Sequence, residues 1–346
     1  MSRGVLTCGR AAASALSMLL LAACTADGEP AEVAAGDPGA TAPNSGSATA
    51  RAEPVEPSPP DASPSHASPP VPEPSAPRVV PGDLRVGRAV RAVQHLAGQI
   101  GPRHGTSPAY QQAVRWVSRE LRALGYDVRR QGFDAPAGVS WGVPVDAGRS
   151  ANVIATLPGA RSTDRHLVVG AHLDTVPQAP GAEDNASGIG VMLAVAAASA
   201  ERRTRLPVTF VAFGAEEPRG PGDAHHHYGS RAYVASLGPA ERRAVAGMVS
   251  LDRVGVGSVV PVGSADLDGR DPRQHAVIDA ARRARVPVVA TYNRSSDHWS
   301  FARAGMPGVR LGSTSYAAYH SAQDVASVVR PAQLERVGRL VLAWLR

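Results

Sequence analysis

The sequence predicts an α/β fold for residues 83–346, a three-layer α/β/α sandwich around a mostly parallel (mixed) central sheet. Short apolar runs of strand length alternate in this region with stretches in which apolar residues recur at helical spacing. Several of the runs are apolar throughout, which is typical of strands that helices cover on both faces. About 260 residues are enough for one domain of ordinary size.

Two amphipathic helices are predicted at the start of this domain. From Asp83 onward, apolar residues recur at helical spacing, at Val86, Val90, Val93, Ala97 and Ile100. Ser107 and Pro108 then provide a cap residue followed by proline at the first helical position, and Gly125 is typical of a helix end. We expect these two helices to serve core packing alone.

After Gly125 the apolar pattern changes to that of strands. Seven runs are predicted to be strands: Tyr126–Phe133, Ala151–Leu157, His166–His172, Val208–Ala215, Ala246–Asp252, Val286–Tyr292 and Gly308–Leu311. Helices are predicted between and after them, at Ala186–Ala200, His275–Ala284 and Pro331–Leu345. Strands and helices in alternation favour parallel strands joined by helical crossovers.

The first 82 residues are predicted to lie outside the fold. Residues 1–23 have a short basic start, an apolar stretch and small residues, as secretory signals do. They end in a pattern that resembles the bacterial lipobox, which predicts lipidation of Cys24 and attachment to the outer face of a cell membrane. An ordinary secreted protein is the alternative. Residues 24–82 are rich in Pro, Ala and Ser, which favours a disordered tether, or else a cleaved propeptide.

Composition limits the classes of partner and of covalent support. The formal charge of +6 falls to +4 when Arg3 and Arg10 leave with the signal, and the chain contains no Lys. The arginines alternate with acidic residues along the predicted helices, so no nucleic-acid partner is expected. Cys8 also lies in the signal, so the single mature cysteine, Cys24, forms no internal disulfide.

Five residues in the second half of the chain predict a two-metal site: His172, Asp184, Glu217, Asp252 and His320. Their side chains are nitrogen and carboxylate donors, which zinc and similar divalent metals prefer. Three of them lie at or just past the end of a predicted strand, where sites form in open α/β sheets. Glu216 stands beside Glu217 as a candidate general base that accepts a proton from water.

Each of these residues also has a simpler explanation when it is taken alone. His172 and Asp174 could be a surface pair; as a site, Asp174 would orient the imidazole through its second N–H. Asp184 could cap the following helix, but neighbouring residues can cap it too, which leaves its carboxylate free to bridge two metals. Glu216 and Glu217 could begin a solvated loop; the alternative is that Glu217 binds metal while Glu216 faces the reacting water.

Together these segments resemble the co-catalytic dizinc aminopeptidases of metallopeptidase family 28, related to secreted bacterial leucyl aminopeptidases. The resemblance extends from about Asp83 to the C-terminus and includes three further segments, Ile100–Gly105, Asn152–Gly159 and Ser296–Phe301. It implies a zinc-exopeptidase type of fold and peptide substrates.

The resemblance also implies a role for each site residue. His172 and Asp252 would bind one zinc, Glu217 and His320 the other, and Asp184 would bridge the two. Glu216 would be the base, and Tyr319 would stabilise the tetrahedral intermediate. The residues Pro218–Tyr228, with the run His225–His227, depart from the family pattern. We expect a solvated loop there, and an accessory metal site is the alternative.

Other functions remain open on the same fold. Glutaminyl cyclases resemble this pattern but carry Trp before the last histidine, where this chain has Tyr319. A carboxypeptidase differs only in residues that line the substrate site. A surface-bound, non-enzymatic lipoprotein would not explain the complete ligand set, and a serine hydrolase would need a G-x-S-x-G elbow that the sequence lacks. The preferred N-terminal residue, the peptide length, the metal used in the cell and the oligomeric state are not predicted.

Overall fold

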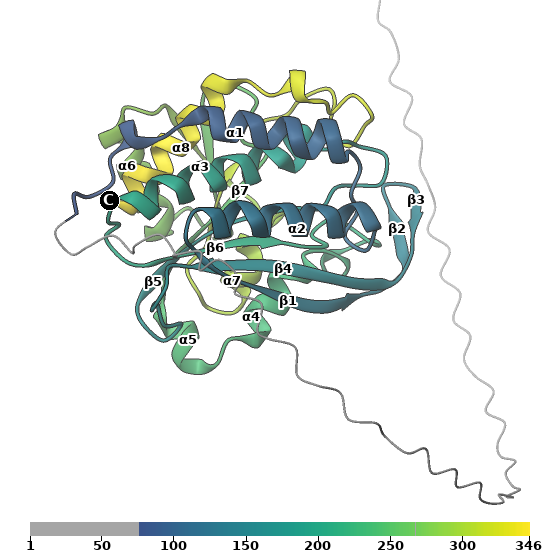
Figure 1. Cartoon of the computed structure of the whole chain (residues 1–346), viewed down its shortest axis with the longest axis horizontal. Coiled ribbons are helices and arrows are strands. Elements are labelled where there is room, and N and C mark those ends of the chain that lie inside the picture. The colour runs from purple at the N-terminus through teal and green to yellow at the C-terminus, as the bar shows by residue number, and fades with distance from the viewer. Residues whose placement is uncertain (1–75, 267) are drawn as a thin grey trace, which may run out of the picture. The chain divides into compact units, whose positions relative to one another are not determined.

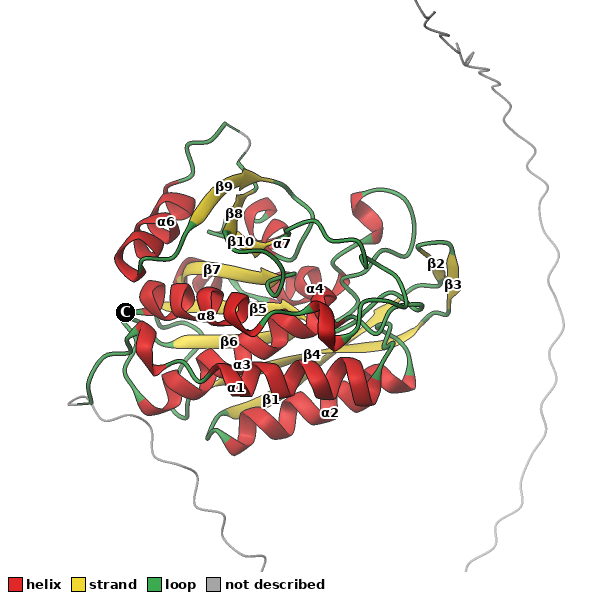
Figure 2. Cartoon of the chain, turned by 90° about the horizontal axis from the view of Figure 1, so that it is seen from above, coloured by secondary structure: helices red, strands yellow, loops and turns green. Residues whose placement is uncertain are grey.

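A computed structural model describes residues 76–346 apart from residue 267, and its central sheet is mixed and eight-stranded (Figures 1 and 2). Its strands are β1 (Asp127–Ala135), β4 (Gly148–Thr156), β5 (His166–His172), β6 (Val208–Phe213), β7 (Val245–Asp252), β8 (Val260–Ser264), β9 (Val288–Tyr292) and β10 (Val309–Gly312). They run in the order β1-β4-β6-β5-β7-β10-β8-β9. A separate hairpin consists of β2 (Gly138–Ser140) and β3 (Val143–Val145).

The pairing of the strands confirms the predicted mixed sheet. Strand β5 lies between β6 and β7 and is parallel to both, β7 is parallel to β10, and β8 is parallel to β9. The pairs β1–β4, β4–β6 and β8–β10 are antiparallel. The seven predicted strands are all present. Strand β8 and the hairpin were not predicted, because three to five residues with Pro or Gly give too short a pattern to recognise.

Eight α-helices accompany the sheet: α1 (Val86–Val93), α2 (Pro108–Ala123), α3 (Ser187–Glu201), α4 (Tyr228–Ser236), α5 (Pro239–Ala244), α6 (Pro272–Ala284), α7 (His298–Arg303) and α8 (Pro331–Leu345). The N-cap of α2 is the predicted Ser107, whose Oγ accepts from the Tyr110 N–H at 3.1 Å. The first predicted helix is less regular, because α1 continues as a π-helical segment, Gln94–Ile100. The short helices α4, α5 and α7 were not predicted.

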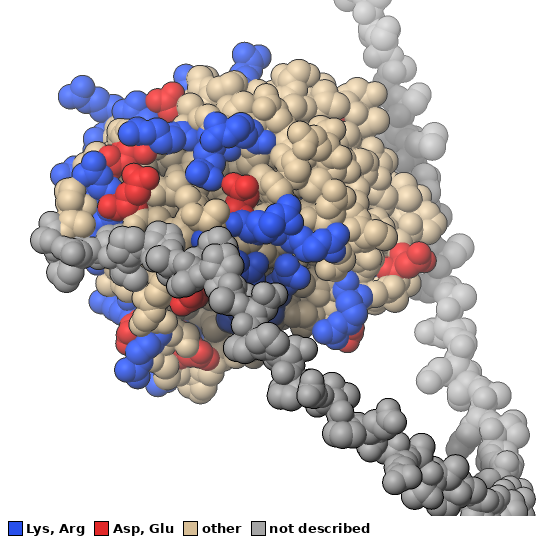
Figure 3. All heavy atoms as spheres, viewed as in Figure 1, with Lys and Arg blue, Asp and Glu red and all other residues tan. Residues whose placement is uncertain are grey.

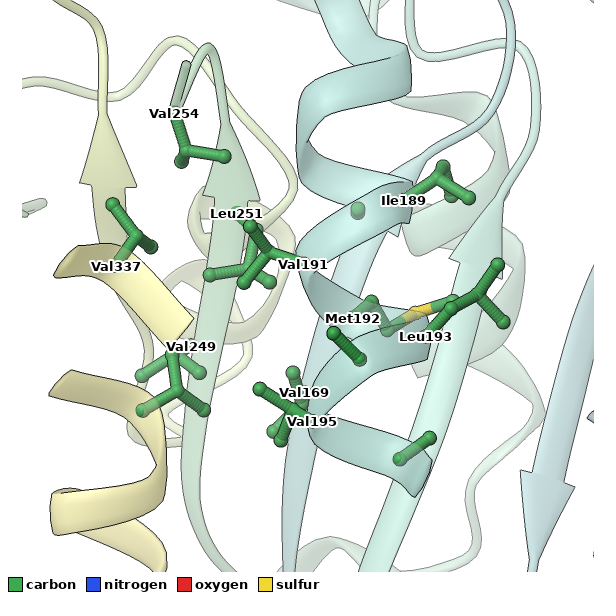
Figure 4. Close-up of a cluster of buried hydrophobic side chains, with 14 of the residues drawn as sticks. Val169, Ile189, Val191, Met192, Leu193, Val195, Val249, Leu251, Val254 and Val337 are labelled. Carbon is green, nitrogen blue, oxygen red and sulfur yellow. The ribbon is translucent and has the colours of Figure 1, made fainter. Parts of the chain in front are cut away.

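Helices cover both faces of the sheet, which makes the three layers. On one face α3 packs against α1, α2 and α8, and a core of Val, Leu, Ile and Met side chains fills the space down to β5 and β7 (Figure 4). Helix α3 is buried almost all round, which explains why its sequence is apolar on every side. On the other face α4 and α7 pack together, and their Tyr233 and Phe301 meet Phe213 of β6 in edge-to-face contacts.

The signal sequence, Cys24 and most of the predicted tether lie outside the described residues. The described fold reaches slightly ahead of Asp83, since Val79 is buried and Arg78 forms a β-bridge with Arg203. Within the described part of the chain, no helix has the length and apolarity to span a membrane. On the face in Figure 3, arginine side chains lie among acidic ones.

Candidate metal centre

Three neighbouring parallel strands bring the predicted ligands to one edge of the sheet. His172 is the last residue of β5 and Asp252 the last of β7, while Glu216 and Glu217 follow the end of β6. The carboxyl ends of parallel strands meet at the same edge, so these side chains converge there. Asp184 arrives from the turn that precedes α3, and His320 from the loop between β10 and α8.

Asp184 joins these side chains into two groups. Its Oδ1 lies 3.1 Å from His172 Nε2, and its Oδ2 lies 3.1 Å from His320 Nε2. Asp252 Oδ1 is 3.8 Å from His172 Nε2, and Glu217 Oε1 is 3.4 Å from His320 Nε2. The two groups are therefore His172–Asp184–Asp252 and Asp184–Glu217–His320, and within each the donor atoms lie within 4.8 Å of one another.

The donor set is chemically suited to divalent cations such as zinc. All five side chains are buried or nearly so, and buried carboxylates are costly unless a cation or hydrogen bonds offset them. Asp184 Oδ1 and Glu217 Oε1 face imidazole nitrogens without forming a hydrogen bond, and His320 Nδ1 is buried without a hydrogen-bond partner. Imidazole nitrogens and carboxylate oxygens are ordinary zinc ligands. Glu216 also lies near His172 and Glu217, as a third group of the same kind.

The pKa values of Glu217 and His320 are both raised in this cluster. Burial raises the pKa of Glu217 to about 8, with nearby Asp184 adding to the effect and His320 opposing it. Burial alone would lower the pKa of His320, but Glu217 and Asp184 raise it to about 10. A metal must displace protons from these side chains when it binds, so its affinity depends on pH.

Asp174 holds the site in a different way from the one predicted. Its carboxylate lies 3.8 Å from His172 Nδ1, which is too long for a hydrogen bond, whereas its backbone carbonyl lies at 3.2 Å. The two carboxylate oxygens instead accept from the backbone N–H groups of Glu216, at 3.0 Å, and Glu217, at 3.1 Å. In place of the predicted hydrogen bond to His172 there is this longer 3.8 Å contact, because the chain turns after β5 and directs the carboxylate toward the segment after β6. Asp174 therefore positions both glutamates.

The run His225–His227 is only partly the solvated loop that was predicted. His225 is exposed, but His227 is buried, with Nε2 3.2 Å from Glu216 Oε1. Its backbone N–H donates to the Glu216 carbonyl at 2.9 Å, which pins the start of α4 beside the candidate base. No metal-binding group among the described residues includes these histidines.

Several residues that support the site were not identified from the sequence. Arg310 of β10 lies 2.9 Å from Asp252 Oδ1 and is fully buried; an arginine inside an apolar strand was the available signal. Asp324 accepts from the backbone N–H groups of Glu183 and Asp184, which fixes the turn that carries Asp184. Arg103, in a segment that resembles the family, is buried and donates to backbone carbonyls of the loop after β5.

Tyr319 lies at the rim of the centre and is 37% exposed. Its ring stacks on that of His320, with centroids 3.7 Å apart, and the Arg253 guanidinium lies 4.4 Å from its centroid. Trp141, in the turn between β2 and β3, contacts both His320 and Tyr319 edge-on. The ring of Tyr319 is thus held at the edge of the ligand cluster.

Solved structures with the same fold include a zinc aminopeptidase from Bacillus subtilis, with a TM-score of 0.67 and 19% identity, covering 75% of this chain and 94% of that one. A glutaminyl cyclase from Porphyromonas gingivalis has a TM-score of 0.66 and 20% identity, covering 76% and 98%. At these identities the similarity establishes the fold, and it confirms the predicted zinc-exopeptidase type of architecture.

Sequence comparison identifies the family. Aminopeptidase YwaD from Bacillus subtilis is 30% identical over 188 residues, which cover 51% of this chain and 40% of that protein. Leupeptin-inactivating enzyme 1 from Streptomyces exfoliatus is 29% identical over 154 residues, which cover 44% and 31%. The chain thus spans less than half the length of these relatives. Residues 152–345, more than half of the chain, match Peptidase family M28. The chain belongs to Peptidase family M28.

Proposed function

We propose that the protein is a zinc-dependent aminopeptidase that hydrolyses N-terminal residues from peptides with the help of two metal ions. The observation that carries this proposal is the division of Asp184 between two groups, one oxygen 3.1 Å from His172 and the other 3.1 Å from His320. A carboxylate in this position suits a bridge between two cations. Family membership and relatives named aminopeptidase support the choice of reaction.

In this proposal His172 and Asp252 would hold one metal, Glu217 and His320 would hold the other, and Asp184 would contribute one oxygen to each. A metal pair held there would supply Lewis-acid polarisation of the scissile carbonyl and would make water more acidic. Glu216 accepts the proton of the attacking water and passes it to the leaving amine. Tyr319 stands beside His320, where its hydroxyl can donate to the oxyanion that forms at the carbonyl.

Glu216 is suited to be the base because it lies beside the two groups that contain Asp184 but belongs to neither of them. Asp174 holds its backbone N–H, and His227 lies 3.2 Å from its Oε1. Burial raises the pKa of Glu216 to about 8, with Asp252 and Asp174 adding to the effect against His172. Cations at the neighbouring ligands would favour the ionised form of Glu216, and an ionised carboxylate can accept the proton of water.

The test is hydrolysis of aminoacyl-4-nitroanilides by the purified chain, with chelator and with added zinc. Chelator-sensitive release that zinc restores is the expected result, together with about two zincs per chain. Bound zinc without hydrolysis of any member of the panel would contradict the aminopeptidase assignment. N-terminal glutaminyl peptides and N-blocked peptides, added to the panel, separate a glutaminyl cyclase and a carboxypeptidase from it.

We further propose that the protein is exported and anchored to the outer face of a cell membrane through Cys24, with residues 24–82 as the tether. The support for this is the apolar signal and the lipobox-like residues before Cys24. A tether of this kind would let the peptidase domain reach peptides outside the cell.

A further inference from the structure

Arg253 follows the ligand Asp252 directly and lies at the rim of the metal centre. Its guanidinium lies 4.4 Å from the centroid of Tyr319, and its Nη2 donates to Ser313 Oγ at 2.6 Å. The side chain is 14% exposed. Nη1 of Arg253 donates to no described residue. It is not a fully buried atom, so solvent can reach it. One side of the guanidinium is therefore open.

Arg253 is the more distant of two arginines that face Asp252. Arg310 Nη2 pairs with Asp252 Oδ1 at 2.9 Å. Arg310 Nη1 donates to the Oγ of Ser295 at 2.9 Å and to its carbonyl at 3.1 Å. Arg253 Nε lies 3.8 Å from Asp252 Oδ1, beyond hydrogen-bond distance. The two arginines thus differ: Arg310 is an internal counterion, and Arg253 is fixed in place but keeps donors for another acceptor.

The backbone at Arg253 is held in a strained conformation. Its φ is +57°, in the left-handed region that disfavours non-glycine residues, and that of Ser313 is +83°. The two segments are tied together, because the Ser313 N–H donates to the Arg253 carbonyl at 3.0 Å. Such strain is unfavourable and concentrates at functional sites.

We propose that Arg253 binds a carboxylate of the substrate close to the scissile bond, so that the enzyme favours substrates that carry one there. This inference rests on the proposed peptidase function. A guanidinium pairs with carboxylates through two parallel hydrogen bonds, and Arg253 keeps Nη1 available. The carboxylate has two possible sources: the C-terminus of a dipeptide, or an acidic side chain on the N-terminal residue.

Matched substrate pairs test this proposal. kcat/KM is measured for Leu-Gly against Leu-Gly-amide, and for glutamyl- against glutaminyl-4-nitroanilide, with the wild type and Arg253→Met. The wild type is expected to prefer the carboxylate member of one pair. Arg253→Met is expected to reduce that preference about 10–100-fold, mainly through KM, as loss of a charged hydrogen bond does. The pair that responds identifies the source of the carboxylate.

The control variant is Arg205→Met, because Arg205 also stacks on an aromatic ring, Trp344, but outside the metal centre. It is expected to keep the wild-type preference. An equal loss on both members of each pair in Arg253→Met, or loss of bound zinc, would show that Arg253 only supports Asp252 and Tyr319, and would overturn the proposal.

A binding measurement separates this inference from the proposed function. Titration calorimetry on the Glu216→Gln protein, with zinc bound, compares Leu-Gly with Leu-Gly-amide and the free dipeptide Glu-Gly with Gln-Gly. Tighter binding of a carboxylate member, lost when Arg253→Met is added, supports the inference without turnover. Equal affinities within both pairs would refute it, whereas silence in every hydrolysis assay would refute the proposed function.

Discussion

At the scale of single residues, the balance of charge around Glu216 decides what the site can do. Burial raises the pKa of Glu216 to about 8; nearby His172 opposes this effect, and the carboxylates of Asp252, Asp174 and Asp184 add to it. Cations at the neighbouring ligands would favour the ionised form of Glu216 and leave a carboxylate able to take a proton. Replacing Glu216 with glutamine keeps the shape and removes this ability.

Glu216→Gln is expected to retain zinc and to lose hydrolysis by about 10²–10⁴-fold, because the proton acceptor is gone while the ligands remain. The measurement is kcat on leucyl-4-nitroanilide together with zinc content by atomic absorption. Glu201→Gln, on the exposed end of α3, is the matched control and should behave as the wild type. Turnover of Glu216→Gln near the wild-type value would refute its role as base.

Asp174→Asn tests the support of the two glutamates. The new amide would present a donor to one of the backbone N–H groups of Glu216 and Glu217, which now donate to the carboxylate at 3.0 and 3.1 Å. We expect zinc affinity to fall roughly 10–100-fold, as for other partners of metal ligands. Competition with a zinc-binding dye measures it, with the exposed Asp164→Asn as control. Unchanged affinity would mean that the backbone after β6 holds its position without Asp174.

At the scale of elements, the loop that follows Glu217 is held by contacts at two of its residues, Arg219 and Asp223. Arg219 is buried and donates to the carbonyls of Pro136 and Asp146. Asp223 accepts from Trp299 Nε1 at 2.9 Å and from Arg303 Nη1 at 2.8 Å, both on α7. The residues between Glu217 and α4 are thus held in place beside Glu216.

Asp223→Ala is expected to loosen this loop without unfolding the domain. Exposed ion pairs contribute about 0–1 kcal/mol, so local opening should become about fivefold more frequent. Limited proteolysis within residues 218–226 measures it, with Asp279→Ala, which breaks an exposed pair with Arg282 on α6, as control. An unchanged cleavage rate would show that Arg219 alone holds the loop.

At the scale of the whole molecule, the metal centre links stability to pH. In the metal-free protein the pKa values of Glu216 and Glu217 rise to about 8 through burial, and that of His320 to about 10 through Glu217 and Asp184. Above pH 6.5 the folded state therefore binds more protons than the unfolded state, and stability falls as pH rises. The slope is about 1.4 kcal/mol per pH unit for each such proton.

We expect the metal-free protein to lose thermal stability between pH 6.5 and 8, and the zinc-loaded protein to lose less, because its ligands are already deprotonated. The gap between the two melting temperatures should widen over this range, as followed by circular dichroism with chelator or zinc. Glu217→Gln removes one of the titrating groups and should flatten the metal-free slope. Melting temperatures that stay parallel would contradict this account of the cluster.

Attachment to a membrane is a prediction about the whole chain. Cys24→Ser should abolish incorporation of labelled fatty acid and release the protein from the membrane fraction of a bacterial host, because the remaining thiol, Cys8, lies within the predicted signal. Cys8→Ser, within the signal, should behave as the wild type. Equal labelling of Cys24→Ser and wild type would rule out lipidation at this residue.

Local patterns in the chain predicted the fold class, and they also pointed to the side chains that the structure brings into one cluster. The apolar runs of β5, β6 and β7 are long enough to be recognised as strands. His172 and Asp252 are the last residues of β5 and β7, and Glu216 and Glu217 come shortly after β6. The parallel packing of such strands places those ends together, so convergence could be anticipated. The strand β8 was missed because its five residues contain a proline and carry too little pattern.

The contacts between distant segments could not be read from the chain. Arg310 meets Asp252 because β10 lies beside β7, and the direction in which Asp174 points follows from a turn. His227 is buried because the loop before it is fastened to α7, although its neighbours are as polar as those of a solvated segment. The spacing of apolar residues along the chain predicts which face of a helix or strand is buried, because that face is formed by residues close together in the sequence. Which charge meets which depends on packing between segments far apart in the chain, and only the folded structure fixes it.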